Sequence, residues 1–162
     1  MAKMQPFWWF LPPPCPSGEQ ILDGGFEAVD PWVYWIRSSS GVYQDSVRKH
    51  SGVYSCAVPR DEWVEQVIAS EAGGISVRCI ASFSLWVLGT GIYHYITLYY
   101  SDGTSTTTQM SIPIDGNWHQ YNIMPLLDPN KTLTMVRYSY PVANPGGTQG
   151  NIDDVSLEGT GV

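Results

Sequence analysis

Asp23-Gly24-Gly25-Phe26-Glu27 and Asn151-Ile152-Asp153-Asp154-Val155-Ser156-Leu157, near the two ends of the 162-residue chain, are the stretches that decide the fold. Each has the composition of a short strand with carboxylates at its edge, and the glycine pair permits a tight turn. If the first and last strands pair, these acids converge on one place. Carboxylate oxygens beside a glycine turn suit Ca²⁺. The two stretches therefore predict a closed β-sandwich with a structural metal site.

The sequence between these stretches alternates short β-type runs with turn residues, and it contains no long segment with helical periodicity. The expected strands lie at residues 32–37, 51–58, 63–68, 75–88, 92–100, 104–114, 118–127 and 133–142. Many short strands at this spacing are typical of sandwiches and barrels. The sequence predicts an all-β fold, an antiparallel β-sandwich of jelly-roll type, over residues 20–162.

Residues 1–19 depart from this pattern and predict an extended N-terminal arm. Five prolines favour an extended path that cannot join a central sheet. They enclose an apolar run, and such a run is a liability on a free arm in water. It either folds back on its own domain or lies in a groove on a neighbouring subunit. In the second alternative the assembly arm consists of Phe7, Trp8, Trp9, Phe10 and Leu11.

The composition argues against some classes of function. A net charge of −7 without a basic cluster argues against nucleic-acid binding. The apolar run of the arm is too short to span a membrane, and it makes a poor signal peptide because no small-residue cleavage site follows it. We therefore expect a chain that stays inside the cell, or one that reaches a virion or another extracellular assembly without a recognisable signal peptide.

The chain has three cysteines, Cys15, Cys56 and Cys79. Cys56 and Cys79 fall in two expected strands and could form a disulfide, which would leave Cys15 unpaired in the arm. Their spacing does not match a metal site, so buried free thiols are the simpler interpretation.

The order of several short motifs resembles the jelly-roll carbohydrate-binding modules of the galactose-binding-like superfamily, such as those attached to xylanases and glucanases. The resemblance covers roughly residues 20–158, and the motifs that carry it lie at residues 22–27, 50–55, 66–68, 99–104, 116–121 and 151–155, together with Trp32. It implies a calcium ion between the first and last strands. Glu27 and Asp153 would supply side-chain oxygens, and the backbone around Gly25 and His50 would supply carbonyls. In the alternative, the two acids cap turns or face water. The resemblance also implies that Trp32, Trp63 and Trp118 are structural.

Sugar binding in that family uses aromatic side chains, whose faces stack on pyranose rings. Strand alternation places Tyr93, Tyr95 and Tyr99 together, and it also places Tyr138 and Tyr140 together. We expect the exposed face, for a carbohydrate or a protein partner, to consist of Trp86, Tyr93, Tyr95, Tyr99, Tyr138 and Tyr140. Aromatic pairs that only stabilise a sheet are an equally good explanation.

No catalytic motif is present, and we expect no enzymatic activity. His94 falls with the core-facing residues of its strand, which indicates a structural histidine. The acids at 61, 62, 65 and 71 form a local cluster typical of a solvated stretch, although an acid pair of a glycosidase would have the same residue types. Our main hypothesis is a non-catalytic structural subunit of a virion surface or filament, held to other protein subunits by its arm. The alternative is a carbohydrate-binding module that recognises a polysaccharide.

Overall fold

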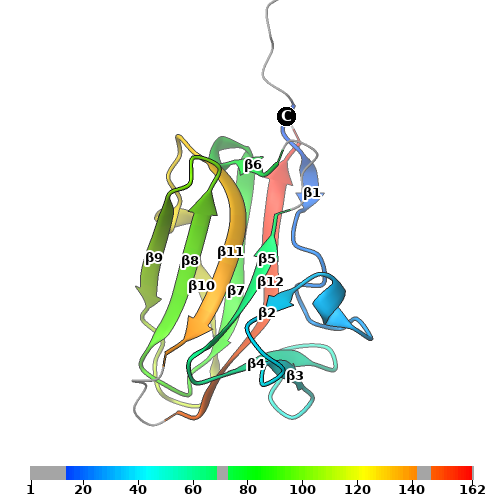
Figure 1. The fold of residues 1–162 in the computed structure, drawn as a ribbon, viewed down its shortest axis with the longest axis vertical. Coiled ribbons are helices and arrows are strands. Elements are labelled where there is room, and N and C mark those ends of the chain that lie inside the picture. The colour runs from blue at the N-terminus through cyan, green and yellow to red at the C-terminus, as the bar shows by residue number, and fades with distance from the viewer. Residues whose placement is uncertain (1–13, 69–72, 142–146, 162) are drawn as a thin grey trace, which may run out of the picture.

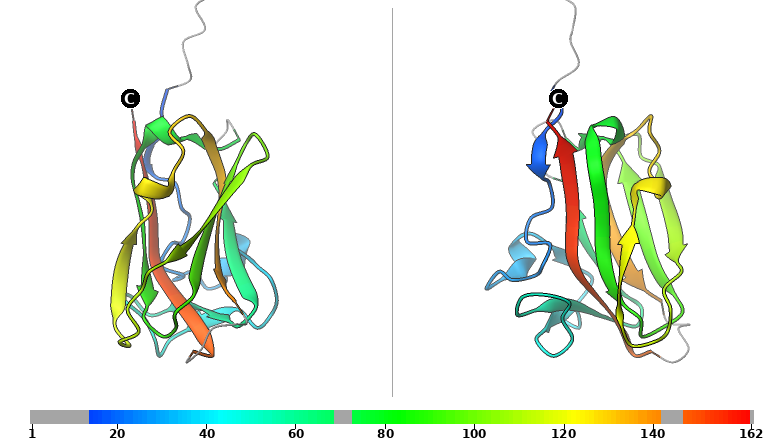
Figure 2. Two further views of the ribbon diagram at one scale, coloured as in Figure 1. Left: turned by 90° about the vertical axis from the view of Figure 1, so that its left-hand side faces the viewer. Right: turned by 180° about the vertical axis from the view of Figure 1, so that it is seen from behind.

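The computed structural model describes residues 14–68, 73–141 and 147–161, and it is an all-β sandwich (Figure 1). The prediction of two antiparallel sheets is confirmed. We call them sheet A and sheet B. In Figure 1, sheet B lies in front of sheet A, and Figure 2 shows the two layers from the side and from behind.

Sheet A contains six strands that pair in an antiparallel manner. Their order is β10 (Trp118–Asn122), β7 (Ile80–Leu88), β12 (Gln149–Thr160), β4 (Ser55–Pro59) and β3 (Tyr43–Asp45), and β1 (Ser17–Glu19) also pairs with β12. The last strand, β12, is central, so it fixes the carboxylates of the 151–157 motif between β7 and β4.

Sheet B also contains six strands. Their order is β2 (Ile36–Arg37), β5 (Glu62–Val67), β11 (Thr132–Tyr140), β8 (His94–Tyr100) and β9 (Ser105–Met110), and β6 (Ile75–Ser76) pairs with β11. Three short 3-10 helices, Pro31–Val33, Val77–Cys79 and Met124–Leu126, connect strands in the described part of the chain.

The core lies between the two sheets and follows the strand period of two. On β7 the side chains of Phe83, Leu85 and Val87 are buried, while Ser82, Ser84 and Trp86 point to the other face. Ile96 and Leu98 of β8 meet them from sheet B. Each sheet therefore has one outer face that the core does not use.

The cysteine pairing differs from both expectations. Cys15 forms a disulfide with Cys79, with Cα atoms 5.2 Å apart, and Cys56 is the free, buried thiol. A Cys56–Cys79 bond is ruled out by register. Cys56 pairs with Ile152 of β12, whereas Ile80, next to Cys79, pairs with Gly159. Those β12 positions are roughly 23 Å apart at about 3.3 Å per residue, far beyond disulfide reach.

The described end of the arm is attached to the sandwich. Strand β1 begins immediately after Pro16, where Ser17 pairs with Thr160. Proline has no backbone N–H, so strand pairing begins with the residues that follow it. The Pro16 carbonyl accepts a hydrogen bond from the Gly161 N–H. Cys15 adds a covalent anchor. The predicted assembly residues Phe7, Trp8, Trp9, Phe10 and Leu11 lie outside the described residues.

Candidate functional site

The predicted carboxylate cluster forms where β12 meets the chain that follows β1. The Gly24 carbonyl accepts a hydrogen bond from Val155 N–H, which ties the first motif to the last. A Cβ at Gly24 would lie 1.9 Å from the Val155 carbonyl oxygen, so only glycine permits this approach. The two motifs therefore meet as predicted, but residues 23–27 form a turn and not the expected strand.

Asp153 is fully buried in this cluster. Its Oδ2 accepts hydrogen bonds from the backbone N–H groups of His50 (2.9 Å) and Ser51 (3.2 Å), and its Oδ1 accepts one from Asp154 (2.8 Å). Burial raises the pKa of Asp153 to about 6 in spite of these bonds. The site therefore holds a carboxylate whose negative charge is incompletely compensated.

Gly25 lies beside Asp153, whereas Glu27 binds a neighbouring segment. Glu27 Oε1 accepts hydrogen bonds from the N–H groups of Val53 (2.8 Å) and Tyr54 (3.0 Å). A Cβ at Gly25 would lie 3.5 Å from Glu27 Cγ and 4.0 Å from Asp153 Oδ1. The Gly25 backbone and the His50 N–H thus lie next to Asp153, and ligation of a metal by the predicted set stays a prediction.

A Ca²⁺ ion takes six to eight oxygen ligands. Oxygen-bearing residues next to glycines, and a buried carboxylate with a raised pKa, fit such a cation. Within residues 14–68, 73–141 and 147–161, however, no three His, Cys, Asp or Glu side chains are grouped as metal ligands. Backbone carbonyls would have to complete the shell, so the calcium ion stays a prediction.

A β-bulge brings Asp154 to the same end of the strand. The pairing of β12 with β7 shifts register between Asp153 and Ser156, and Asp154 has a φ of 44°. As a result, Asp154 Oδ2 lies 2.7 Å from His50 Nδ1, and Ser51 Oγ donates to its Oδ1 at 2.9 Å. The segment at 50–51 is therefore held by both aspartates.

Trp86 belongs to this region and not to the tyrosine face, so its predicted placement is wrong. Its ring stacks on His50, with centroids 3.7 Å apart and planes 16° apart, and Trp118 lies 6.0 Å from His50. Trp86 sits opposite Asp153 on the outer face of sheet A. The sequence predicts a strand over residues 75–88 but does not indicate which of the two sheets this strand joins.

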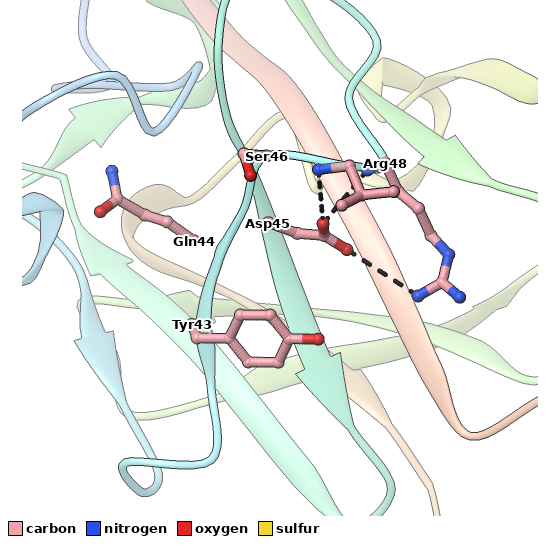
Figure 3. A pocket seen from close by; sticks show the side chains of 6 residues that line it. Tyr43, Gln44, Asp45, Ser46 and Arg48 are labelled. Atoms are coloured by element: carbon pink, nitrogen blue, oxygen red, sulfur yellow. Dashed lines mark hydrogen bonds and ion pairs between the residues drawn. The ribbon is translucent and has the colours of Figure 1, made fainter.

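Asp45 holds together the turn that precedes the His50 segment, and Figure 3 shows its carboxylate facing Arg48. Asp45 accepts hydrogen bonds from the N–H groups of Val47 (2.8 Å) and Arg48 (3.1 Å) and lies 3.8 Å from the Arg48 guanidinium. Burial would raise the pKa of Asp45, but these bonds outweigh it and lower the pKa. The turn borders a hollow of about 340 Å³ lined by residues 43–48. Its lining comes from a single segment, which indicates a structural turn.

The second candidate site is the outer face of sheet B. Cross-strand register aligns the outward residues in rows: Trp63 with Ser139 and Tyr95, Glu65 with Arg137 and Thr97, and Met135 with Tyr99. The outward positions of β5, β11, β8 and β9 are Trp63, Glu65, Val67, Met135, Arg137, Ser139, Tyr95, Thr97, Tyr99, Ser105, Thr107 and Gln109. We use "the outer face of sheet B" for this set.

Arg137 lies at the centre of this face, between two aromatic rings. Its guanidinium carbon is 4.2 Å from the centroid of Trp63 and 5.2 Å from that of Tyr99. Its Nε and Nη2 donate to Glu65 Oε2 at 2.7 and 2.6 Å. The aromatic rings are thus held in place by a charged group that is itself held by a carboxylate.

The predicted face contained two residues, Tyr95 and Tyr99, that the structure does place on this surface. Trp63 is half-buried on this face, so the core position that the resemblance implied for it is wrong. Arg137 and Glu65 were not predicted as part of it. Strand alternation was the available signal, because Val64 and Gln66 are buried between Trp63, Glu65 and Val67.

Tyr138 and Tyr140 are buried, so their predicted exposure is wrong. They do share one face of β11, but that face packs against the core. The Tyr138 hydroxyl lies 2.7 Å from His94 Nδ1, and His94 Nε2 lies 3.1 Å from the Gly91 carbonyl. Its full burial and these two contacts confirm the predicted structural histidine, and burial lowers the pKa of His94 to about 4.

Tyr93 is also absent from the paired rows. It precedes β8, which begins at His94, and its side chain is half-buried in the connection. Glu62 and Glu65 of the local acidic cluster point to opposite sides of β5. Glu65 binds Arg137, and Glu62 accepts hydrogen bonds from Ser38 and Ser39, on the other side of β5. The fourth acid, Glu71, lies outside the described residues.

Comparison with known proteins shows that this chain is similar to some of them in fold. No protein-family model and no curated protein matches the sequence. Among solved structures, the C-terminal family 22 carbohydrate-binding module of Clostridium thermocellum Xyn10B is similar with a TM-score of 0.53 at 12% identity, over 86% of this chain and 92% of that one. TmCBM61, solved with β-1,4-galactotriose, has a TM-score of 0.53 at 19% identity, over 87% of this chain and 98% of that one.

A further similar structure comes from a larger protein. The enzymatically active domain of bacteriophage CBA120 tailspike protein 4 has a TM-score of 0.56 at 15% identity, over 87% of this chain but only 21% of that one. Among the described residues, no helix has the length and apolar character that crossing a membrane requires. The chain has the jelly-roll fold seen in carbohydrate-binding modules.

Proposed function

We propose that this protein binds a polysaccharide through the outer face of sheet B and does so without catalysis. The observation that carries the proposal is the cluster of Trp63, Arg137 and Tyr99 on three neighbouring strands, in which two aromatic rings flank a guanidinium group. Aromatic faces stack on the C–H faces of pyranose rings, and a guanidinium donates hydrogen bonds to sugar oxygens.

Polar side chains surround the aromatic rings. Thr97 and Thr107 form a hydrogen bond of 2.9 Å, and the Tyr95 hydroxyl donates to Gln109 Oε1 at 3.4 Å. Hydroxyl and amide groups of this kind can exchange hydrogen bonds with the hydroxyls of a sugar. They stand on β8 and β9, while Trp63 stands on β5, so the surface spans neighbouring strands and suits several consecutive sugar units.

The scaffold keeps this surface in one conformation before a ligand arrives. Its residues stand on four neighbouring strands, and the ion pair of Arg137 with Glu65 orients the central side chain. Binding to a pre-organised surface loses little conformational entropy. Strand pairing and the ion pair thus support polysaccharide binding together with the residue types.

The other hypothesis, a virion or filament subunit, depends on the apolar arm. Phe7, Trp8, Trp9, Phe10 and Leu11 lie outside the described residues, so no contact supports docking on a neighbour. The similar folds include carbohydrate-binding modules, which favours the binding hypothesis. Polysaccharide is therefore the partner that these observations favour.

We also propose that Ca²⁺ binds beside Asp153 in a structural role, and that the protein works in an oxidising compartment. The incompletely compensated charge of Asp153 supports the first statement. The Cys15–Cys79 disulfide supports the second, because disulfides persist mainly outside reducing cytosols. An extracellular place would give the protein access to polysaccharide.

Affinity electrophoresis in gels that contain single soluble polysaccharides tests the binding proposal. At least one xylan, mixed-linkage glucan or galactan should retard the wild-type protein, and Trp63→Ala should reduce its affinity about tenfold or more, as expected for a central aromatic contact. Trp86→Ala is the matched control, because Trp86 lies on the opposite sheet. Equal loss in both variants, or no retardation by any polymer, would refute the proposal.

A further inference from the structure

The outer face of sheet B carries one cation and one anion, and the two neutralise each other. Every other outward residue of β5, β8, β9 and β11 is uncharged. Lys131, which immediately precedes β11, is itself paired with Asp102 at 3.2 Å. The face as a whole therefore offers hydrogen-bond donors and aromatic rings without a net charge.

The geometry of the pair explains how the neutralisation affects a ligand. Glu65 is only 7% exposed, and a single oxygen, Oε2, accepts both the Nε–H and the Nη2–H of Arg137. The Arg137 side chain is 28% exposed and retains three further N–H donors. A sugar hydroxyl can accept from those donors. A sugar carboxylate that did so would also meet the negative charge of Glu65.

We propose that Glu65 makes this face selective for neutral polysaccharides and against polymers that carry uronate groups. This inference rests on the proposed function, because it concerns the same surface. Without the charge of Glu65, Arg137 would be an uncompensated cation between two aromatic rings. Such a site attracts carboxylates, as buried or half-buried guanidinium groups do in other binding sites.

The test compares a neutral polymer that binds the wild-type protein with polygalacturonate, both measured by affinity electrophoresis or calorimetry at about 0.15 M salt. Glu65→Gln keeps the shape and one acceptor but removes the charge. Glu62→Gln is the matched control, since it removes the same charge from the same strand on the other side, where Glu62 binds Ser38 and Ser39. Glu65→Gln plus Arg137→Gln removes both charges.

We expect the wild-type protein and Glu62→Gln to bind the neutral polymer and to bind polygalacturonate at least fivefold more weakly. Glu65→Gln should gain about fivefold or more in affinity for polygalacturonate, a gain that decreases as salt is raised. The double variant should lose that gain. These three results together support the inference.

Two results would overturn it, and both differ from failure of the proposed function. One is a wild-type protein that binds polygalacturonate as tightly as the neutral polymer, a result that stands even if Glu65→Gln does not fold. The other is an equal response of Glu65→Gln and Glu62→Gln. Failure of the wild-type protein to bind any neutral or acidic polymer would instead refute polysaccharide binding as such.

Discussion

The stability of the metal-free protein should depend on the protonation of Asp153. This side chain is fully buried, and burial raises its pKa to about 6 from an ordinary value of 3.8. Because the folded-state pKa is above the unfolded one, the protonated form favours folding. The contribution is complete below about pH 4 and is lost as pH rises through about 6. A shift of about 2 pKa units corresponds to about 3 kcal/mol.

The assay is thermal unfolding of the wild-type protein and Asp153→Asn from pH 3.5 to 7.5 in the presence of a chelator. Other carboxylates, such as Asp102 and Asp115, have pKa values lowered to about 2 and change stability in the opposite direction at lower pH. The difference between the two proteins removes their effect. Stability of the wild-type protein relative to the variant should fall by about 3 kcal/mol, or about 6–12 °C in Tm, across this range.

Calcium should reverse this trend. A cation beside Asp153 stabilises the carboxylate, so added Ca²⁺ should raise the Tm of the wild-type protein more at pH 7.5 than at pH 4. Asp154→Asn is the control, because Asp154 is one-third exposed and binds His50 and Ser51. A difference between wild type and Asp153→Asn that stays constant with pH would refute the reasoning about burial. An absence of any Ca²⁺ effect would refute the metal proposal.

Two further predictions concern the frame of the sandwich. Reduction should lower the wild-type Tm by about 8–16 °C, because the disulfide closes a loop with a sequence separation of 64 and contributes about 4 kcal/mol. The Tm of a Cys15→Ser, Cys79→Ser variant should not change on reduction. Equal sensitivity of both proteins to reductant in a thermal scan would contradict the pairing. Gly24→Ala should lower the free energy of unfolding by about 3 kcal/mol, because its Cβ would meet the Val155 carbonyl. Gly18→Ala, at a φ of 73° in open space, should lower it by only about 1–2 kcal/mol. Similar urea midpoints for the two variants would contradict the close approach.

The carboxylate cluster could be predicted from sequence because its information is local. Glycines at 24 and 25 permit close approach whatever the rest of the chain does, and Asp153 lies in the motif that ends the fold. Pairing of the first and last motifs then needed only the assumption of a closed sandwich. The β-bulge that also brings in Asp154 left no sequence pattern.

The burial of the tyrosines could not be predicted from sequence. Alternation divides β11 into two faces, but it does not tell which face meets the other sheet. The Tyr138 hydroxyl forms a hydrogen bond with the buried His94. A residue that is both apolar and polar, such as tyrosine, could therefore be assigned to the core only once its hydrogen-bond partner was known. The same limit applies to Trp63, whose position in a similar family suggested burial although its neighbours on β5 alternate.

The disulfide was missed for a different reason. Cys15 lies in a proline-rich segment that has no strand periodicity, so its position relative to the sandwich depends on β1, a strand of only three residues. Strands as short as this carry too few residues for an alternation pattern. The pairing became clear only from the register of β12 with β1 and β7.

Titration of a ¹⁵N-labelled sample with the best-binding oligosaccharide tests the central claim most directly, because the seven tryptophan indole N–H signals report on separate parts of the molecule. The signal of Trp63, identified by its absence in Trp63→Phe, should shift strongly on binding, since its ring lies on the outer face of sheet B beside Arg137. The signals of Trp86 and Trp118, beside His50 on sheet A, should stay in place. Strong shifts of Trp86 or Trp118 with an unchanged Trp63 would contradict the account.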